Sequence, residues 1–285
     1  MITSLTNDTV KYVDKLKKKA SFRREEQSFV VEGIRMLREV PENLRRMLFV
    51  TEESLERFPE LSGWCDRVET VSEGVLQKLS DTQTPQGMLA VVRIPVPVAD
   101  EERHLPAEQD EHRGQAGAEE KGAAAGSRAP LILVLDGLQD PGNVGTLIRT
   151  AEAFGATEVL LSANAADPFS PKVVRSTMGS LFRVPIRIAE NLVAELEQLK
   201  RQGVQVLGTH LKGQDFYAAD LTGPVAILIG NEGNGLSDAV AATADLLVRI
   251  PMEGQVESLN AAISGSVVGY EILRQRRTAG AGSPC

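Results

Sequence analysis

Six short apolar runs separated by helical patterns constrain the fold of residues 131–277 more than any other feature of the chain. They predict strands at 131–136, 158–162, 184–188, 204–209, 225–229 and 246–250, with helices at 143–155, 171–178, 190–202, 236–242 and 258–275. Nearly continuous apolar strands that alternate with helices are typical of a buried parallel sheet. Because ligands of such sheets bind beyond the carboxyl ends of the strands, we expect the functional site in the loops there.

The first 97 residues show the same alternation with shorter elements. Val10, Val13 and Leu16 stand at helical spacing, whereas SFVVEG (28–33) and GMLAVVRI (87–94) are typical of strands. The predicted fold class is therefore α/β, with a small domain at residues 1–97 and a larger one at 130–277. Residues 98–129 are rich in Ala, Gly and Glu and predict a flexible acidic linker, and residues 278–285 predict a disordered tail.

The net charge of -8 conceals an uneven distribution of charge. Residues 1–24 carry seven Lys or Arg against two Asp, whereas residues 100–121 carry eight Asp or Glu against three Lys or Arg. A basic arm of this kind attracts phosphates, although most charge runs are only solvated faces. The acidic total therefore does not exclude a nucleic acid as the partner.

The N-terminus and the cysteines bear on the cellular compartment. No continuous apolar run of signal-peptide type begins the chain, and LILVL (131–135) is far shorter than the roughly 20 residues of a membrane-spanning helix. The two cysteines, Cys65 and Cys285, cannot build a disulfide framework or a zinc site. We expect a cytoplasmic protein with no metal and no membrane partner.

The first polar loop, DGLQDPGNVGTLIRTAEAFGA (136–156), follows the strand LILVL. Asn143 lies near the start of the next helix. Arg149 follows six residues later, nearly two helical turns on, so we expect both side chains on roughly the same side, where they could address one ligand. A capped helix with a surface arginine is an equally good interpretation of this segment alone. The loop lacks the G-x-G-x-x-G pattern of a dinucleotide site.

The second polar loop, GNEGNG (230–235), follows the strand VAILI (225–229). Its glycines permit positive φ angles and a close approach of the main chain to a ligand, although alone it is an ordinary strand-to-helix turn. It lacks the Lys-Ser/Thr ending of a phosphate-binding loop, which argues against a metabolic enzyme that uses a nucleoside triphosphate. Glu232 has less structural reason to stand here than a glutamate on a helix surface.

The third polar segment, RIPMEGQVESLNAAISGSVVGYEILRQR (249–276), joins a strand end to a long helix. We expect Ser258 to cap that helix, and Asn260 has poor helix propensity for its first turn. Small residues, Gly265 and Gly269 among them, make the helix slim. A glycine in a helix interior costs about 1 kcal/mol relative to alanine, so close packing is the expected reason, within the fold or across a dimer.

In order and spacing, these three loops resemble the signature motifs of the SpoU/TrmH family of RNA ribose methyltransferases. The matching patterns are N-x5-R from Asn143, G-N-E-G-x-G from Gly230, and I-P-M…S-L-N from Ile250. VVRSTMGSLFRVPI (173–186) is similar as well, and the resemblance covers 131–277. Less sharply, FVVEGIRMLREV (29–40) and LSDTQTPQGMLAVV (79–92) resemble the ribosomal-protein-like substrate domain of the members that modify rRNA.

The resemblance implies a C-terminal α/β methyltransferase domain with a trefoil knot, S-adenosylmethionine as the cofactor, and an active site formed across a homodimer. It implies that the cofactor is held by Thr209, Gly208, Gly230, Asn231, Gly233, Ile250, Met252 and Leu259. It also implies that the reacting ribose is surrounded by Asn143, Arg149, Glu232, Ser258 and Asn260. In the family the counterpart of Arg149 is proposed as the base. An arginine stays protonated in proteins, so our hypothesis is that Arg149 orients the hydroxyl or stabilises the developing alkoxide.

The same resemblance gives the basic arm a role in binding RNA phosphates. The residues predicted to bind RNA are Lys18, Arg23, Arg24, Glu32 and Arg35. The expected activity is methyl transfer to a ribose 2'-hydroxyl of RNA, with 23S rRNA favoured because of the separate N-terminal domain. A tRNA 2'-O-methyltransferase and a non-catalytic RNA-binding dimer remain alternatives.

Overall fold

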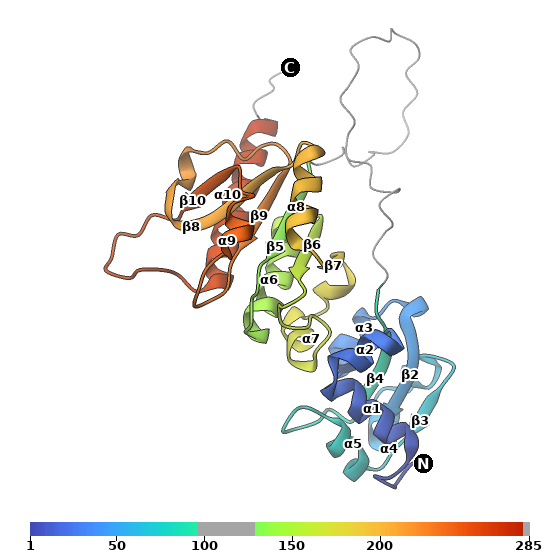
Figure 1. Ribbon diagram of the computed structural model, residues 1–285. Helices are drawn as coiled ribbons and strands as arrows, with labels where there is room; N and C mark the ends of the chain where they lie inside the picture. Colours follow the sequence, from blue (N-terminus) through green and yellow to red (C-terminus); the bar gives the residue numbers. More distant parts are fainter. Residues whose placement is uncertain (96–128, 282–285) are drawn as a thin grey trace.

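The computed structural model describes residues 1–95 and 129–281 and shows two α/β units (Figure 1). The predicted linker, apart from Ala129, lies outside the described residues. The first unit contains β1 (Ser28–Glu32), β2 (Arg45–Val50), β3 (Val68–Thr70), β4 (Met88–Arg93), α1 (Asp8–Lys18), α2 (Ala20–Glu26), α3 (Ile34–Glu39), α4 (Glu52–Arg57) and α5 (Glu73–Leu79). The second contains β5 (Leu131–Leu135), β6 (Glu158–Ser162), β7 (Ile186–Ala189), β8 (Gln205–Asp215), β9 (Val225–Ile229), β10 (Leu246–Arg249), α6 (Pro141–Phe154), α7 (Pro171–Thr177), α8 (Leu192–Arg201), α9 (Asp238–Ala241) and α10 (Ala261–Ala281).

The first unit is a four-stranded sheet in the order β1-β4-β2-β3 with helices on both faces. β4 is antiparallel to β1 and β2, whereas β3 is parallel to β2. Successive residues of β1 point to opposite faces, so Val30 packs with Val13 of α1 while Phe29 packs with Leu37 of α3. The predicted small α/β arrangement is what the structure has.

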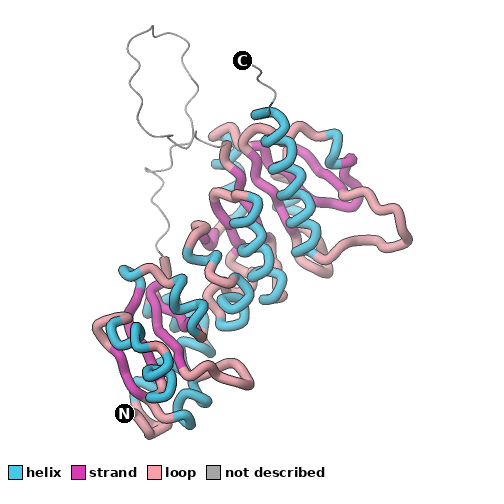
Figure 2. Tube along the Cα trace, turned by 180° about the vertical axis from the view of Figure 1, so that it is seen from behind, coloured by secondary structure: helices cyan, strands magenta, loops and turns pink. Residues whose placement is uncertain are grey.

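The second unit is a six-stranded sheet in the order β10-β8-β9-β5-β6-β7, and every strand pair in it is parallel. Leu133 of β5 packs on the side of α6 and α10, and Val134 on the side of α8 and α9. Figure 2 shows α6 and α10 side by side over one face. The prediction of a parallel sheet buried on both sides is confirmed.

The starts of α6, α8, α9 and α10 differ from the prediction by two or three residues, and those of α6 and α10 bear on the cavity described below. α6 begins at Pro141, because the Asp140 side chain accepts a hydrogen bond from the Asn143 N–H at 2.9 Å and caps the helix. α10 begins at Ala261, and its cap is Asn260 rather than Ser258: the Asn260 Oδ1 accepts from the Ala262 N–H at 2.9 Å. α10 also continues through 278–281, which we predicted to be disordered, and 282–285 lie outside the described residues.

β8 is longer than the predicted strand 204–209, since it continues to Asp215. The added residues pair with β10 after a register shift between Leu247 and Val248. Gly213 allows this approach, because a Cβ there would lie 2.5 Å from the Val248 carbonyl carbon. The long strand places one wall of the cavity described below.

The two units pack directly against each other through α7 and β1. Phe29 of β1 lies 5.1 Å from Phe169, measured between ring centroids. The buried Arg23 donates from Nε to the Asp167 Oδ2 at 2.8 Å, and Arg175 pairs with Asp81 at 2.8 Å. This aromatic contact and these two ion pairs therefore fix the position of one unit on the other. Among the helices of the described ranges, none is long and apolar enough to cross a membrane.

Candidate active site

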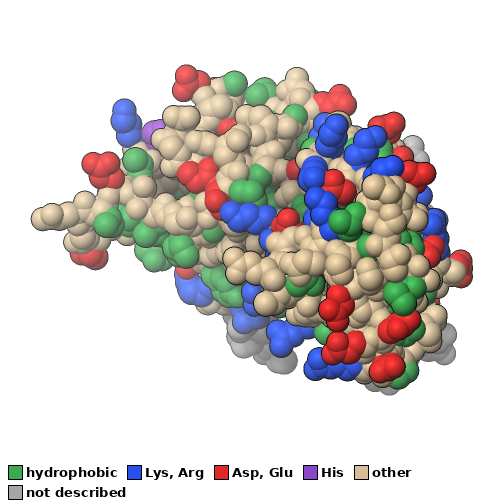
Figure 3. Space-filling view, turned by 90° about the horizontal axis from the view of Figure 1, so that it is seen from below, with side chains coloured by type: hydrophobic (Ala, Val, Ile, Leu, Met, Phe, Trp, Pro, Cys, Tyr) green, Lys and Arg blue, Asp and Glu red, His purple; other side chains and the backbone are tan. Residues whose placement is uncertain are grey.

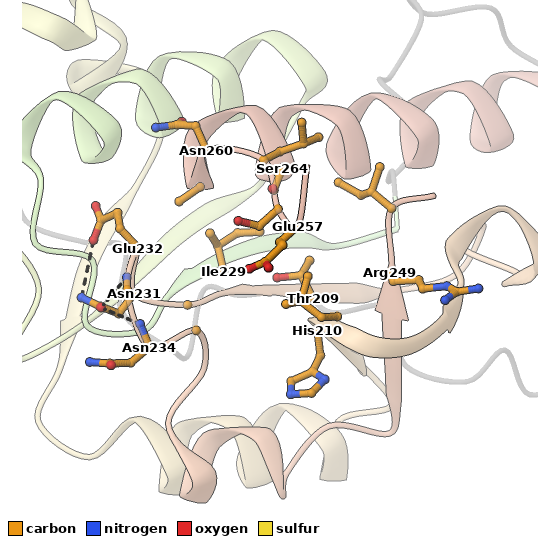
Figure 4. Close-up of a pocket in the computed structure, with 18 of the residues that line it drawn as sticks. Thr209, His210, Ile229, Asn231, Glu232, Asn234, Arg249, Glu257, Asn260 and Ser264 are labelled. Atoms are coloured by element: carbon orange, nitrogen blue, oxygen red, sulfur yellow. Dashed lines mark hydrogen bonds between the residues drawn. The ribbon is translucent and has the colours of Figure 1, made fainter. Parts of the chain in front are cut away.

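A cavity of about 560 Å³ lies at the carboxyl edge of the larger sheet, between the ends of β8, β9 and β10 and the start of α10 (Figure 4). Its volume lies within the range of about 300–1,000 Å³ that small-molecule sites have. It is lined by most of the predicted cofactor residues: Thr209, Gly230, Asn231, Gly233, Ile250, Met252 and Leu259. The predicted ribose residues Glu232, Ser258 and Asn260 line it too.

Gly208 is the predicted cofactor residue that does not line this cavity. Its neighbour Thr209 faces the cavity, and successive residues of a strand face opposite sides. A Cβ on Gly208 would lie 2.7 Å from the Leu247 Cδ2 and 3.2 Å from the Leu236 Cδ1. Gly208 is therefore explained by packing between β8 and its neighbours rather than by a ligand.

The loop 230–235 is a tight hairpin of the main chain. The Asn231 N–H donates to the Gly235 carbonyl at 2.9 Å, and the Gly235 N–H donates back to the Asn231 carbonyl at 2.9 Å. A Cβ on Gly230 would lie 2.2 Å from the Gly235 carbonyl carbon, and Gly235 itself has φ +70°. The hairpin thus requires glycine at both positions, while Gly233 has neither a crowded Cβ position nor a positive φ.

Hydrogen bonds join all three predicted loops at one point beside the cavity. The Asn143 Nδ2 donates to the Glu232 Oε1 at 3.0 Å, and the Asn260 Nδ2 donates to the Asn143 Oδ1 at 3.0 Å. The main-chain N–H groups of Asp140 and Gln139 also donate to the Glu232 carboxylate, at 3.1 and 3.2 Å. Residues more than 80 positions apart in the chain are thus brought into one network.

These hydrogen bonds determine the charge state of Glu232. Burial would raise the pKa of its carboxyl, but the hydrogen bonds from Asn143 and from the main chain at Glu232, Asp140 and Gln139 outweigh burial and lower that pKa. An ionised carboxylate whose oxygens already accept several hydrogen bonds is suited to holding Asn143 in place. It is less suited to taking up a proton from a substrate.

Arg149 lies outside this network, contrary to our expectation that it and Asn143 share one side of the helix. At about 100° per residue, side chains six positions apart point roughly 120° apart around an α-helix. Arg149 is exposed, does not line the cavity, and makes no side-chain hydrogen bond or ion pair with any residue of 1–95 or 129–281. Within one chain the two residues do not address the same ligand.

The five residues predicted to bind RNA fall into two groups. Lys18, Arg24 and Arg35 are exposed, with Lys18 forming an ion pair to Asp14 at 2.7 Å. Arg23 is only 4% exposed and Glu32 accepts from the Thr82 hydroxyl at 2.8 Å. In this conformation Arg23 cannot present its guanidinium to RNA, because it is enclosed between the two units.

The motif patterns missed several residues of the cavity wall. The cavity wall includes Ile229, the last residue of β9 before the glycine loop. It also includes Ala261 and Ser264 of α10, which follow Asn260. Glu257 lines it as well, and nothing in its immediate sequence predicted this. No group of three or more His, Cys, Asp or Glu suited to a metal ion occurs in the part of the chain that the structure describes.

A parallel α/β sheet with a cavity at its carboxyl edge defines a class of α/β proteins that bind a small ligand there. Comparison with known proteins makes the class specific. The model of the SpoU rRNA Methylase family matches residues 130–270, and that of the MRM3-like substrate binding domain matches residues 7–90. The chain is 32% identical to the 23S rRNA (guanosine(2553)-2'-O)-methyltransferase RlmP of Bacillus subtilis, over 95% of this chain and 98% of that relative.

Solved structures agree with the sequence comparison. The AdoMet-bound rRNA methyltransferase from Sinorhizobium meliloti has a TM-score of 0.75 and 30% identity, covering 96% of this chain and 97% of that one. The SpoU methyltransferase AviRb from Streptomyces viridochromogenes, in complex with the cofactor AdoMet, has a TM-score of 0.76 and 29% identity, covering 95% and 100%. The chain belongs to the SpoU rRNA methylase family. The predicted family, enzyme class and cofactor are thereby confirmed.

Proposed function

We propose that this enzyme transfers a methyl group from S-adenosylmethionine to a ribose 2'-hydroxyl of 23S rRNA. The observation that carries the proposal is the contact of Asn143, Glu232 and Asn260 beside a cavity of cofactor size. The cavity suits the cofactor chemically as well. Ile229, Ile250 and the other apolar lining residues can enclose its adenine and thioether portions, and the glycine loop offers main-chain polar groups.

The cofactor supplies an electrophilic methyl group on a sulfonium, and the residues of this chain align the acceptor ribose. Asn143 accepts from Asn260 and donates to Glu232, so its orientation is fixed before RNA arrives. Ser258 is exposed at the cavity wall, where its hydroxyl would hydrogen-bond the ribose. We propose these residues as the ribose side of the site and the 230–235 and 250–259 loops as the cofactor side.

A homodimer is the second part of the proposal. Ile263 and Tyr270, seven residues apart on one face of α10, are 51% and 50% exposed, and Val256 in the preceding loop is 62% exposed. That loop projects from the body of the molecule, with hydrophobic side chains gathered beside it (Figure 3). Large exposed apolar patches mark protein interfaces. We propose that the face carrying them pairs two copies, and that Arg149 of one copy serves the cavity of the other.

Three further features rest on the family relationship. We propose a trefoil knot at the place where residues 250–260 pass beside the 230–235 loop and line the same cavity. The first unit, which matches a substrate-binding domain, would attract RNA through Lys18, Arg24 and Arg35. With ribosomal RNA as its substrate, the enzyme would work in the cytoplasm.

The test supplies the purified chain with S-adenosylmethionine labelled on the methyl group and either protein-free 23S rRNA or tRNA. We expect label in 23S rRNA within an alkali-resistant dinucleotide, because a 2'-O-methyl group blocks alkaline cleavage. Asn143→Ala should abolish the labelling, and Asn43→Ala, in the first unit, serves as the control. Label in tRNA alone would show that tRNA rather than 23S rRNA is the substrate. Binding of the cofactor without methyl transfer would favour the non-catalytic RNA-binding dimer.

The role of Arg149 has its own test, a pH–rate profile of Arg149→Lys. A planar guanidinium donates two parallel hydrogen bonds that an ammonium cannot reproduce. We therefore expect the maximal rate to fall while the shape of the profile stays unchanged. Near-wild-type activity of the lysine variant would remove any special need for a guanidinium.

A further inference from the structure

A carboxylate outside the predicted motif positions lies in the cofactor cavity. Glu257 lines the cavity, and Figure 4 places it between Ser264 of α10 and Thr209 of β8. Its side chain makes no hydrogen bond or ion pair with any residue of the described ranges 1–95 and 129–281. The charge of Glu257 is therefore available to whatever occupies the cavity.

The other charged residues of the cavity wall are engaged or directed elsewhere. The Glu232 carboxylate already accepts hydrogen bonds from Asn143, Asp140 and Gln139. His210 and Arg249 point away from the centre of the cavity in Figure 4, and Lys212 is exposed on the outer part of β8. The cavity thus offers a ligand one negative side chain that no positive group of the wall compensates. A ligand with a positive charge near Glu257 would be favoured.

We propose that Glu257 binds the sulfonium of S-adenosylmethionine and makes the cavity prefer the cofactor over its product. This inference rests on the proposed function. The cofactor carries a positive sulfur, whereas S-adenosylhomocysteine, left after methyl transfer, carries a neutral thioether. Both retain the same ammonium and carboxylate. A carboxylate near the sulfur therefore stabilises the cofactor more than the product, and it favours release of the product after each transfer.

Isothermal titration of the full chain with each of the two molecules tests the proposal. We expect Glu257→Gln to bind S-adenosylmethionine about two- to fivefold more weakly, the effect of an exposed ion pair, and to bind S-adenosylhomocysteine unchanged. Glu257→Lys should reverse the preference. Glu253→Gln is the matched control, since Glu253 is an exposed glutamate of the same loop that does not line the cavity.

The outcomes separate this inference from the proposed function. An unchanged ratio of the two affinities in Glu257→Gln, with the wild type binding the cofactor, overturns the role of Glu257 alone. An equal loss of affinity for both molecules also overturns it, because it would place the carboxylate at the shared ammonium. A wild-type chain that binds neither molecule would instead overturn the proposed function and this inference with it.

Discussion

Glu232 stabilises the site through its neighbours. Its two carboxylate oxygens accept from the Asn143 amide and from the N–H groups of Asp140 and Gln139, so it joins the second polar loop to the first. Because these bonds lower its pKa, the carboxylate stays ionised throughout the neutral range. Glu232 is a positioning residue, and Asn143 is what it positions.

The variant Glu232→Gln tests this role. A glutamine has one acceptor oxygen in place of two, so the donors on the other oxygen lose their partner. We expect kcat/KM to fall roughly tenfold, as for the loss of an exposed charge-assisted hydrogen bond. Methyl transfer measured at pH 7 gives the size of the fall in kcat/KM, with Glu253→Gln as the control. A variant as active as the wild type would show that Asn143 is held by Asn260 alone.

The lowered pKa of Glu232 also predicts a pH dependence. A carboxyl whose folded pKa lies below its unfolded value contributes stabilisation that is present above the unfolded pKa and lost as the pH falls through the folded pKa. We therefore expect Glu232 to stay ionised near neutrality, so that its protonation changes the activity of the wild type only in acid, where the activity falls. Glu232→Gln should lack that acidic decline in a comparison of the two pH profiles.

At the scale of elements, the larger unit depends on how closely α10 lies on α6. A Cβ on Gly269 would lie 2.4 Å from the Phe154 ring, and a Cβ on Gly265 would lie 2.5 Å from the Leu147 Cδ2. The sequence left open whether the slim face of α10 packs within the fold or across a dimer. These contacts show that Gly265 and Gly269 pack within the fold. The exposed Ile263 and Tyr270 leave a different face of α10 for a partner.

Two glycine-to-alanine variants should act in opposite directions. Gly269→Ala forces the Phe154 ring to move, and we expect a loss of about 1–2 kcal/mol after the gain in helix propensity is subtracted. Gly74 of α5 has nothing within 4 Å of its Cβ position, so Gly74→Ala should stabilise the first unit by up to about 1 kcal/mol. Thermal unfolding midpoints of both variants check the signs, and a stabilised Gly269→Ala would contradict the packing.

At the scale of the whole molecule, the ion pair between the buried Arg23 and the partly buried Asp167 sets the position of one unit on the other. Arg23 also donates to the Lys17 carbonyl at 3.0 Å, so it ties α1 and α2 to the larger unit at once. Asp167→Asn leaves the buried guanidinium without a counter-charge and should weaken this docking by about 1–3 kcal/mol. We expect weaker binding of RNA and unchanged binding of S-adenosylmethionine. Glu60→Gln, which alters an exposed ion pair, is the control; equal RNA affinities would contradict a role for the interface.

The proposed dimer predicts complementation between two inactive chains. Arg149→Ala should retain its cavity, and Ser264→Phe should fill the cavity while keeping Arg149. If Arg149 serves the partner's cavity, mixed dimers contain one intact site and recover up to half of the wild-type activity. Light scattering confirms that each variant still pairs. If mixtures that do form mixed dimers recover no activity, Arg149 does not serve the cavity of the partner chain.

The sequence predicted the parallel sheet and most of the cavity, because apolar runs and glycine loops are local signals. It failed where distant residues decide the outcome. Ser258 and Asn260 are both plausible caps by residue type, and only the contact of Asn260 with Asn143 shows which one is used. Arg23 looked like one more cation of a basic arm, since the carboxylate that buries it lies 144 positions away. Gly208 was predicted to bind the cofactor for the same reason, since the residues that crowd it are distant in sequence. They come from β10 and from the segment before α9.

The hairpin at 230–235 has a consequence for how such a chain can change over generations. Gly230, Gly233 and Gly235 present only main-chain atoms to the cavity, and substitution of neighbouring side chains leaves those atoms as they are. The proposed ribose side, by contrast, consists of side chains such as Asn143 and Ser258, and the unit proposed to face RNA is a separate α/β unit. Mutational drift can therefore retune which RNA is modified while the cofactor stays the same, so substrate choice and methyl donor are inherited as separable traits.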